Sequence, residues 1–468
     1  MTPHTSVAPS NRFPNVISVG NPFQMIGFGI LLVFLFILFS RTFDVVLSSL
    51  QIPFAISCLV VAATVFSGGI LRIWQHKIGR YFLAFTVWMG LAIPFSFWRG
   101  GSIIVFQGWL KAFLIYICIV GLIATYDQTL RAIKVLGFSV LTLAALALTL
   151  GNNDSGRLFL TEGKFQNPND LAQIMLIGLP LLWLMVKDTS QNLLFKIPTL
   201  LLSGLVFYVM LKTGSRGAIF GFLAMLMFVF LRASMTDRVA ILALSMFMFL
   251  AALIVVPASL RSRYITLFSS DSAEEGSSST RDLTDIAVAS SEARQRVLMK
   301  SVEMTLRYPI FGVGPGMFAE AVEDDLRQQG KRTTFLLSHN SYTQVSSELG
   351  FPGLFLYLAI LVACFRATGA VVKLSRTRSG PRWENVGNTA ACLRMTLVAY
   401  CVTVLFSSVA YQSLLPAIAG LCTALYMSVQ EELVQELAGI PLPLEESSNV
   451  MRPVPSAPRL PSPAGQRI

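Results

Sequence analysis

The sequence predicts an all-α, multi-pass membrane protein with about twelve transmembrane helices and one long loop between the ninth and the tenth. The prediction rests on the composition, on apolar runs and on the placement of basic residues. Hydrophobic residues make up 54% of the chain and charged residues 13%, whereas a soluble domain carries about 25% charged residues. Apolar runs recur along most of the 468 residues. One membrane bundle is therefore expected, rather than two or three soluble domains.

The expected helices are apolar runs long enough to cross a bilayer, which takes about 20 residues. They lie near residues 23–40, 48–70, 81–98, 103–124, 131–150, 171–187, 194–211, 217–231, 239–257, 350–366, 390–410 and 413–430. The first nine form a membrane bundle over residues 23–257, and the last three occupy residues 350–430. The remaining parts are an N-terminal tail (1–22), the long loop (258–349) and a C-terminal tail (431–468) whose Pro and Ser content predicts disorder.

The orientation follows from Lys and Arg in the short loops, which gather on the cytoplasmic side. With the N-terminus inside, the inner segments hold 16 of these residues and the outer short loops hold 6. Both termini are therefore expected in the cytoplasm, and the long loop outside. The net charge of +11 does not indicate nucleic-acid binding, because the basic residues are dispersed among short loops.

The long loop is expected to contain two short helices joined by a turn. Residues 291–309 form an amphipathic pattern with Val297 and Met304 on one face and Leu298 as a further candidate for it, and residues 319–329 form the second helix. The glycine- and proline-rich stretch 311–318 reads as a turn. It does not follow a strand with GxGxxG spacing, so it does not indicate a nucleotide site.

The turn between the seventh and eighth helices is one candidate for chemistry on the outer face. Gly214 and Gly217 allow a ligand to approach the backbone closely. Ser215 can cap the next helix, whose N-terminus favours an anion. Arg216 adds a planar donor fork that suits phosphate. Taken alone, the turn fits equally well an arginine that only reaches the membrane interface.

The other candidates lie in the long loop. Arg294 has Arg296 and Lys300 nearby, which alone indicates a solvated basic face. His339 is the only histidine on the predicted outer face, and a neutral imidazole with a pKa near ~6.5 can accept a proton. A capping or packing histidine is an equal alternative. Asn340 can cap the helix that follows, and Glu348 is a supporting candidate about two and a half turns further along it.

Neither a metal nor a cofactor is expected. The predicted outer face has a single histidine and no cysteine cluster, and the six cysteines of the chain lie inside apolar runs without metal-binding spacing. The sequence also lacks a phosphate-binding loop of the Walker type.

Four motifs occur in one order on this multi-spanning chain and together resemble the bacterial O-antigen ligase and polymerase superfamily. They are FQNPNDLA (165–172), GSRGA (214–218), an arginine at 294 followed by PIFGVGPGMF (309–318), and HNSYTQVSSELGFPG (339–353). The resemblance covers roughly residues 160–365.

This resemblance implies a metal-independent, inverting glycosyltransferase in the bacterial inner membrane, with the long loop in the periplasm. Such an enzyme moves a glycan from an undecaprenyl diphosphate carrier to an acceptor hydroxyl at the periplasmic face. Arg216 and Arg294 then correspond to diphosphate-binding residues, with Arg296 as an alternative, and His339 corresponds to the general base. The aromatic residue that is common four places after the loop arginine is Leu298 here.

Lipid A-core is the acceptor expected for a ligase. A polymerase, which uses a second lipid-linked glycan, and a protein O-oligosaccharyltransferase share the donor chemistry and stay open as alternatives. A non-catalytic polysaccharide transporter is a different class. Transporters often place ionisable residues at mid-membrane, whereas the candidate residues here gather at one face, which favours an enzyme.

Overall fold

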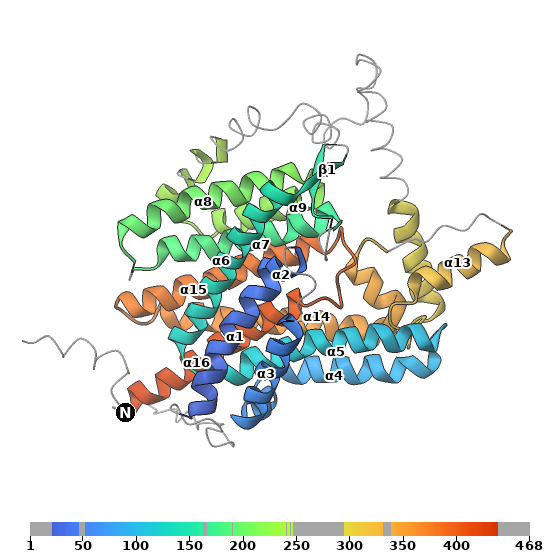
Figure 1. Cartoon of the computed structure of the whole chain (residues 1–468), viewed down its shortest axis with the longest axis horizontal. Helices are drawn as coiled ribbons and strands as arrows, with labels where there is room; N and C mark the ends of the chain where they lie inside the picture. Colours follow the sequence, from blue (N-terminus) through green and yellow to red (C-terminus); the bar gives the residue numbers. More distant parts are fainter. Residues whose placement is uncertain are drawn as a thin grey trace, which may run out of the picture.

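The structure is a computed structural model, which describes residues 21–45, 52–154, 156–161, 166–189, 191–239, 241–243, 245–246, 294–330 and 338–438. Within these ranges the protein is almost entirely helical, and most of the long helices pack side by side in one bundle (Figure 1). Their apolar side chains form one continuous core.

Eight of the described helical segments are long and apolar enough to cross a membrane. They are α1 (Pro22–Ser40), α4 with the short η2 (Lys77–Ala92 and Ile93–Phe95), α5 (Arg99–Leu122), α6 (Tyr126–Leu150), α7 (Pro168–Lys187), α8 (Leu193–Lys212), α14 (Ser341–Ser375) and α16 (Leu414–Leu437). A short helix, α2 (Thr42–Val45), follows α1. The multi-pass membrane architecture predicted from the sequence is thereby confirmed.

Three further predicted spans differ from a straight, apolar helix. The second, predicted over 48–70, consists of α3 (Ile52–Phe66) and the 3-10 helix η1 (Gly69–Gln75), which are bent by 72°. The apolar run predicted there is therefore a bent pair of helices rather than one continuous helix. The bend brings Gly69 against the backbone of Gly121 in α5, with no room for a Cβ atom.

The helix α9 (Arg216–Phe230) has only 15 residues. The helix α15 (Pro381–Thr403) has 23 residues but is more polar than the eight spans. The ninth predicted span, 239–257, lies almost entirely outside the described residues. The total of about twelve helices therefore stays a prediction.

A β-hairpin between α6 and α7 departs from the all-α prediction. The strand β1 (Asn152–Asp154) pairs antiparallel with β2 (Arg157–Phe159), so that Asp154 lies opposite Arg157. Leu158 is buried and fixes the hairpin to the core.

Two predicted boundaries also change. Helix α14 begins at Ser341, inside the predicted loop, and is broken at Gly350, where the membrane span was predicted to start. Helix α16 continues to Leu437, beyond residue 430, where the last span was predicted to end. The rest of the C-terminal tail beyond residue 438, the N-terminal tail before residue 21 and most of the long loop before residue 294 lie outside the described residues.

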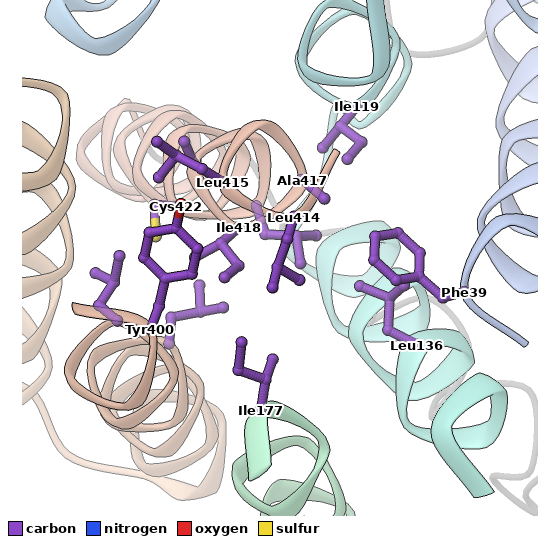
Figure 2. Packing of buried hydrophobic residues seen from close by; sticks show 14 of the residues in the cluster. Phe39, Ile119, Leu136, Ile177, Tyr400, Leu414, Leu415, Ala417, Ile418 and Cys422 are labelled. Carbon is purple, nitrogen blue, oxygen red and sulfur yellow. The ribbon is translucent and has the colours of Figure 1, made fainter. Parts of the chain in front are cut away.

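Helix α16 runs through the middle of the bundle, and most of its residues are buried. Figure 2 shows its first turns, with Leu414 and Ile418 directed toward Leu136 of α6 and Ile177 of α7. Phe39 of α1 lies beyond Leu136 in the same cluster. This packing fixes the position of the segment that precedes α16.

The predicted inner segments meet at one end of the bundle. Acidic residues in the last turns of α16 pair with arginines from two predicted inner loops. The pairs are Arg72–Glu431 at 3.3 Å, Arg382–Glu432 at 2.6 Å and Arg378–Glu436 at 2.6 Å. In Figure 1 this end of α16 lies away from α13 (Phe318–Gln328), the second predicted helix of the long loop. The candidate residues belong to the opposite end.

Candidate functional site

The turn before α9 holds the first candidate arginine. Gly214 adopts a left-handed conformation with φ +64°, which glycine allows at little cost. The Ser215 hydroxyl accepts a hydrogen bond from the Ala218 N–H at 3.4 Å and so caps α9, as predicted. Arg216 is the first residue of that helix and is half-buried.

Arg157 ties the β-hairpin to this turn. Its Nε donates a hydrogen bond to the Thr213 carbonyl oxygen at 2.9 Å, and its terminal NH2 group donates to Asn169 Oδ1 at 3.0 Å. Asn169 lies in the first turn of α7, within the FQNPNDLA motif. One guanidinium therefore fixes three elements at the candidate site. In the sequence, Arg157 reads only as a basic residue of an outer loop, because nothing in its spacing links it to Thr213.

Residues 404–411, called here the connecting segment, join α15 to α16 and support α9. A Cβ added to Gly217 would come within 2.8 Å of the Phe406 Cβ, so that only glycine allows this close approach. The ring of Phe220 stacks on Phe406 with a centroid distance of 5.7 Å. The turn that carries Arg216 therefore rests on the connecting segment.

The N-terminus of α14 rests on the same connecting segment. The Ser341 N–H donates to the Val404 carbonyl oxygen at 2.8 Å. The Ser341 hydroxyl donates to the Ser407 carbonyl oxygen at 2.7 Å and accepts from the Val409 N–H at 3.0 Å. The motifs around Arg216 and Ser341 are more than 120 positions apart in the sequence, yet one segment supports both.

His339 stands directly before this helix. Its φ of +51° is uncommon for a residue other than glycine. Asn340 Oδ1 accepts hydrogen bonds from the N–H groups of Tyr342 at 2.9 Å and Thr343 at 3.2 Å, so Asn340 caps α14 as predicted. Burial lowers the pKa of His339, and the positive charge of Arg294 lowers it further. Both effects favour the neutral imidazole over the protonated one.

The helix over residues 294–307 distinguishes the two loop arginines. Arg294 is its first described residue and is half-buried, whereas Arg296 is exposed. Of the two, Arg294 is the one whose charge acts on His339. Lys300 does not belong to a solvated basic face, because it pairs with Asp325 of α13 at 2.6 Å.

The inner face of this helix matches the predicted pattern. Val297 and Met304 are 3% and 1% exposed, and they pack with Val313 and Phe318 in a small second core. Leu298 is 36% exposed and does not share that face. The helix and α13 thus form one unit at the end of the bundle.

The break in α14 is stabilised by the turn that follows residues 294–307. Gly350 has φ +69° and ψ −173°, which ends the short helical segment 341–349. The carbonyl oxygens of Ser347 and Glu348 accept hydrogen bonds from the N–H groups of Val313 at 2.8 Å and Gly314 at 3.0 Å. Backbone groups exposed by the break are thereby satisfied inside the protein.

The buried carboxyl group of Glu348 contacts this turn and, among the described residues, makes no hydrogen bond with the His339 imidazole. Its Oε2 accepts a hydrogen bond from the Gly316 N–H at 2.9 Å. The turn also contacts the loop between α4 and α5, since the Phe97 N–H donates to the Val313 carbonyl oxygen at 2.9 Å. Glu348 is thus a structural support for the segment that carries His339.

Residues 200–358 match the family model Wzy_C, described as O-antigen ligase. The matched range contains the Arg216 turn, the helix that starts at Arg294 and the His339 segment. The match covers this part of the chain and supports its similarity to the O-antigen ligase superfamily. The resemblance inferred from the four motifs is thereby confirmed.

The comparisons with curated proteins and with solved structures do not add to this assignment. No curated protein matches the chain. The chain is similar, at 16% identity and a TM-score of 0.41, to one in a solved structure described as "Structural coordination of polymerization and crosslinking by a peptidoglycan synthase complex". The similarity covers 75% of this chain and 97% of that one.

Within the O-antigen ligase domain, the predicted residues fall into two groups. Arg294 lies close enough to His339 to lower its pKa, and the Arg216 turn shares the connecting segment with the helix that follows His339. In the second group, Arg296 is exposed and Glu348 accepts a hydrogen bond from Gly316. The first group brings two guanidinium groups and one imidazole to the same end of the bundle.

Proposed function

We propose that the protein is an O-antigen ligase-like, inverting glycosyltransferase of the bacterial inner membrane. It would transfer a glycan from an undecaprenyl diphosphate carrier to a hydroxyl of lipid A-core at the periplasmic face. The single observation that supports this best is that the charge of Arg294 acts on His339, while the helix that follows His339 and the Arg216 turn rest on the same connecting segment.

The two arginines supply the charge that the reaction needs. Cleavage of the bond between the sugar and the diphosphate leaves negative charge on the leaving group. Arg216 and Arg294 can each donate paired hydrogen bonds to phosphate oxygens, and such charge stabilisation requires no metal. We therefore expect the reaction to proceed in the presence of EDTA.

His339 is assigned the role of general base, which removes the proton of the acceptor hydroxyl. The acceptor oxygen attacks the anomeric carbon from the face opposite the diphosphate, which inverts that carbon, while the imidazole takes the hydroxyl proton. Before the donor binds, the charge of Arg294 opposes protonation of the imidazole. A bound diphosphate offsets that charge, so the base becomes stronger when the substrate is present.

The decisive experiment uses the purified protein, a glycan on undecaprenyl diphosphate, and two acceptors offered separately. Transfer to lipid A-core would support the ligase. Elongation of a second lipid-linked glycan would instead identify a polymerase. His339→Gln keeps a hydrogen-bonding group but no basicity, so it should abolish turnover while the donor still binds. Normal turnover by a folded His339→Gln protein would remove the base from this mechanism.

The proposed periplasmic position of the site has its own test. Ser379 lies in the loop between α14 and α15, at the end of the bundle where Arg378 pairs with α16. In intact cells, a cysteine at Ser379 should resist a membrane-impermeant thiol reagent, and it should react once the membrane is opened. Labelling from outside in intact cells would reverse the proposed orientation.

A further inference from the structure

The helix over 294–307 carries a second apolar face, opposite its buried one. Met299, Val302 and Leu306 are 65%, 41% and 67% exposed, and Ile310 just beyond the helix is 57% exposed. Intervals of three and four residues place the three helical side chains on one line. These four residues, called here the apolar stripe, point away from Val297 and Met304, which pack beneath the helix.

The apolar stripe continues into the surface of two membrane-spanning helices. The Phe351 N–H donates to the Pro309 carbonyl oxygen at 2.8 Å, so the end of the stripe contacts α14 just after its break. Phe351 and Phe355 are 49% and 71% exposed on the spanning part of α14. The apolar side chains on the outside of a span face lipid, and the stripe extends that surface.

A second contact reaches α4. The ring of Phe311 stacks on Phe95 with a centroid distance of 4.2 Å and on Trp88 at 5.0 Å. Phe95 closes the span that begins at Lys77, and it is 62% exposed. Aromatic side chains with this exposure at the end of a span are typical of the membrane–water interface.

The direction of the helix agrees with these contacts. In Figure 1 the helix over 294–307, drawn in olive before the gold α13, runs across the ends of α4 and α5 rather than along them. A helix that crosses the end of a transmembrane bundle lies roughly in the membrane plane. On its flank, Tyr308 and Arg307 are exposed, and Arg307 pairs with Asp325 of α13 at 3.0 Å. An exposed tyrosine there suits the level of the lipid head groups.

We infer that the apolar stripe is inserted in the outer leaflet of the bilayer, at the boundary between head groups and acyl chains. The partner of this surface is lipid. Interfacial helices bury their apolar face about 5–10 Å deep at this boundary, whereas a row of large apolar side chains on a helix in water would favour association. The inference concerns the membrane alone and does not depend on the proposed function.

The test places an environment-sensitive fluorophore, NBD, on single cysteines of the full-length protein. Cys58 is replaced by serine, because it is exposed while the other five cysteines are buried or half-buried. Leu306→Cys and Val302→Cys report on the stripe, and Gln328→Cys at the exposed end of α13 is the control. The proteins are reconstituted in vesicles of phosphatidylethanolamine and phosphatidylglycerol.

We expect blue-shifted emission from positions 306 and 302, and quenching by lipids that carry a nitroxide near the head group. Position 328 should show neither effect. Emission at 306 and 302 that matches position 328 would overturn the inference. A label that is shielded from water but not quenched by the lipids would also overturn it, because another protein, such as a second copy of the chain, would then cover the stripe. Loss of transferase activity plays no part in this readout.

Discussion

Gly350→Ala should strongly destabilise the protein, because the break in α14 depends on a backbone conformation that only glycine adopts readily. At φ +69° and ψ −173°, a residue with a Cβ costs about 1–3 kcal/mol. The added Cβ would also collide with the Ile310 carbonyl group. Both partners in this collision are fixed to the backbone, so a change of side-chain rotamer cannot relieve it.

The size of this destabilisation follows from the hydrogen bonds that are lost when the 309–316 turn is displaced. Withdrawal of the 309–316 turn would break the hydrogen bonds from Val313 to Ser347, from Gly314 to Glu348 and from Phe351 to Pro309. Each contributes about 1 kcal/mol. With the conformational cost, the free energy of unfolding should fall by roughly 4–6 kcal/mol.

Gly108→Ala in α5 is the matched control, because a Cβ there has no neighbour within 4 Å in the described structure. This alanine should stabilise its helix by up to about 1 kcal/mol. Unfolding of both variants in mixed micelles with increasing dodecyl sulfate gives the comparison. Stabilities of Gly350→Ala and Gly108→Ala that agree within 1 kcal/mol would refute the role assigned to the break.

Three further predictions concern the chemistry. Arg216→Ala and Arg294→Ala should each lower the transfer rate by about 10²–10³, and lysine at either position should restore it only in part. Arg296→Ala should stay near wild type. The opposite result for Arg294 and Arg296 would move the phosphate-binding role in the loop from position 294 to position 296. The transfer rate should fall as the pH drops through the pKa of His339, which burial and Arg294 hold below the usual ~6.5. In Arg294→Ala this fall should therefore occur at higher pH. An unchanged pH profile would show that Arg294 does not act on His339. Arg157→Lys keeps the charge but cannot reach both Thr213 and Asn169. We expect kcat to fall by about tenfold, which is the effect of losing one charge-assisted hydrogen bond. An unchanged kcat would show that the link between the hairpin and the turn does not matter for the reaction.

Features that depend on short stretches of sequence were predictable. Asn340 was expected to cap a helix, and Val297 and Met304 were expected on one buried face, because capping and amphipathicity act over a few neighbouring residues. The bend after α3 had a local signal in Gly68 and Gly69, which the hydropathy run concealed. The β-hairpin likewise had a turn signal, the DSG of residues 154–156, within a loop that was treated only for its charge.

Features that depend on distant contacts were not predictable from one sequence. The connecting segment reads as LFSSVAY after its first residue, with no motif, yet it supports both candidate turns. Arg157 is 56 positions from Thr213, and only the folded bundle brings them together. Hydropathy predicts which segments span the membrane, but it does not predict which other segments they pack against.

The break at Gly350 also separates the helical register of the two parts of α14. In a continuous helix, one inserted residue rotates everything beyond it by roughly 100°. Here the lower part of α14, residues 351–375, can gain or lose a residue without turning His339, since rotation is not transmitted through Gly350. The same insertion within residues 341–349 would turn the Ser341 end away from Val404 and Ser407. The membrane-spanning part of this helix can therefore vary in length with bilayer thickness while the orientation of the site stays fixed.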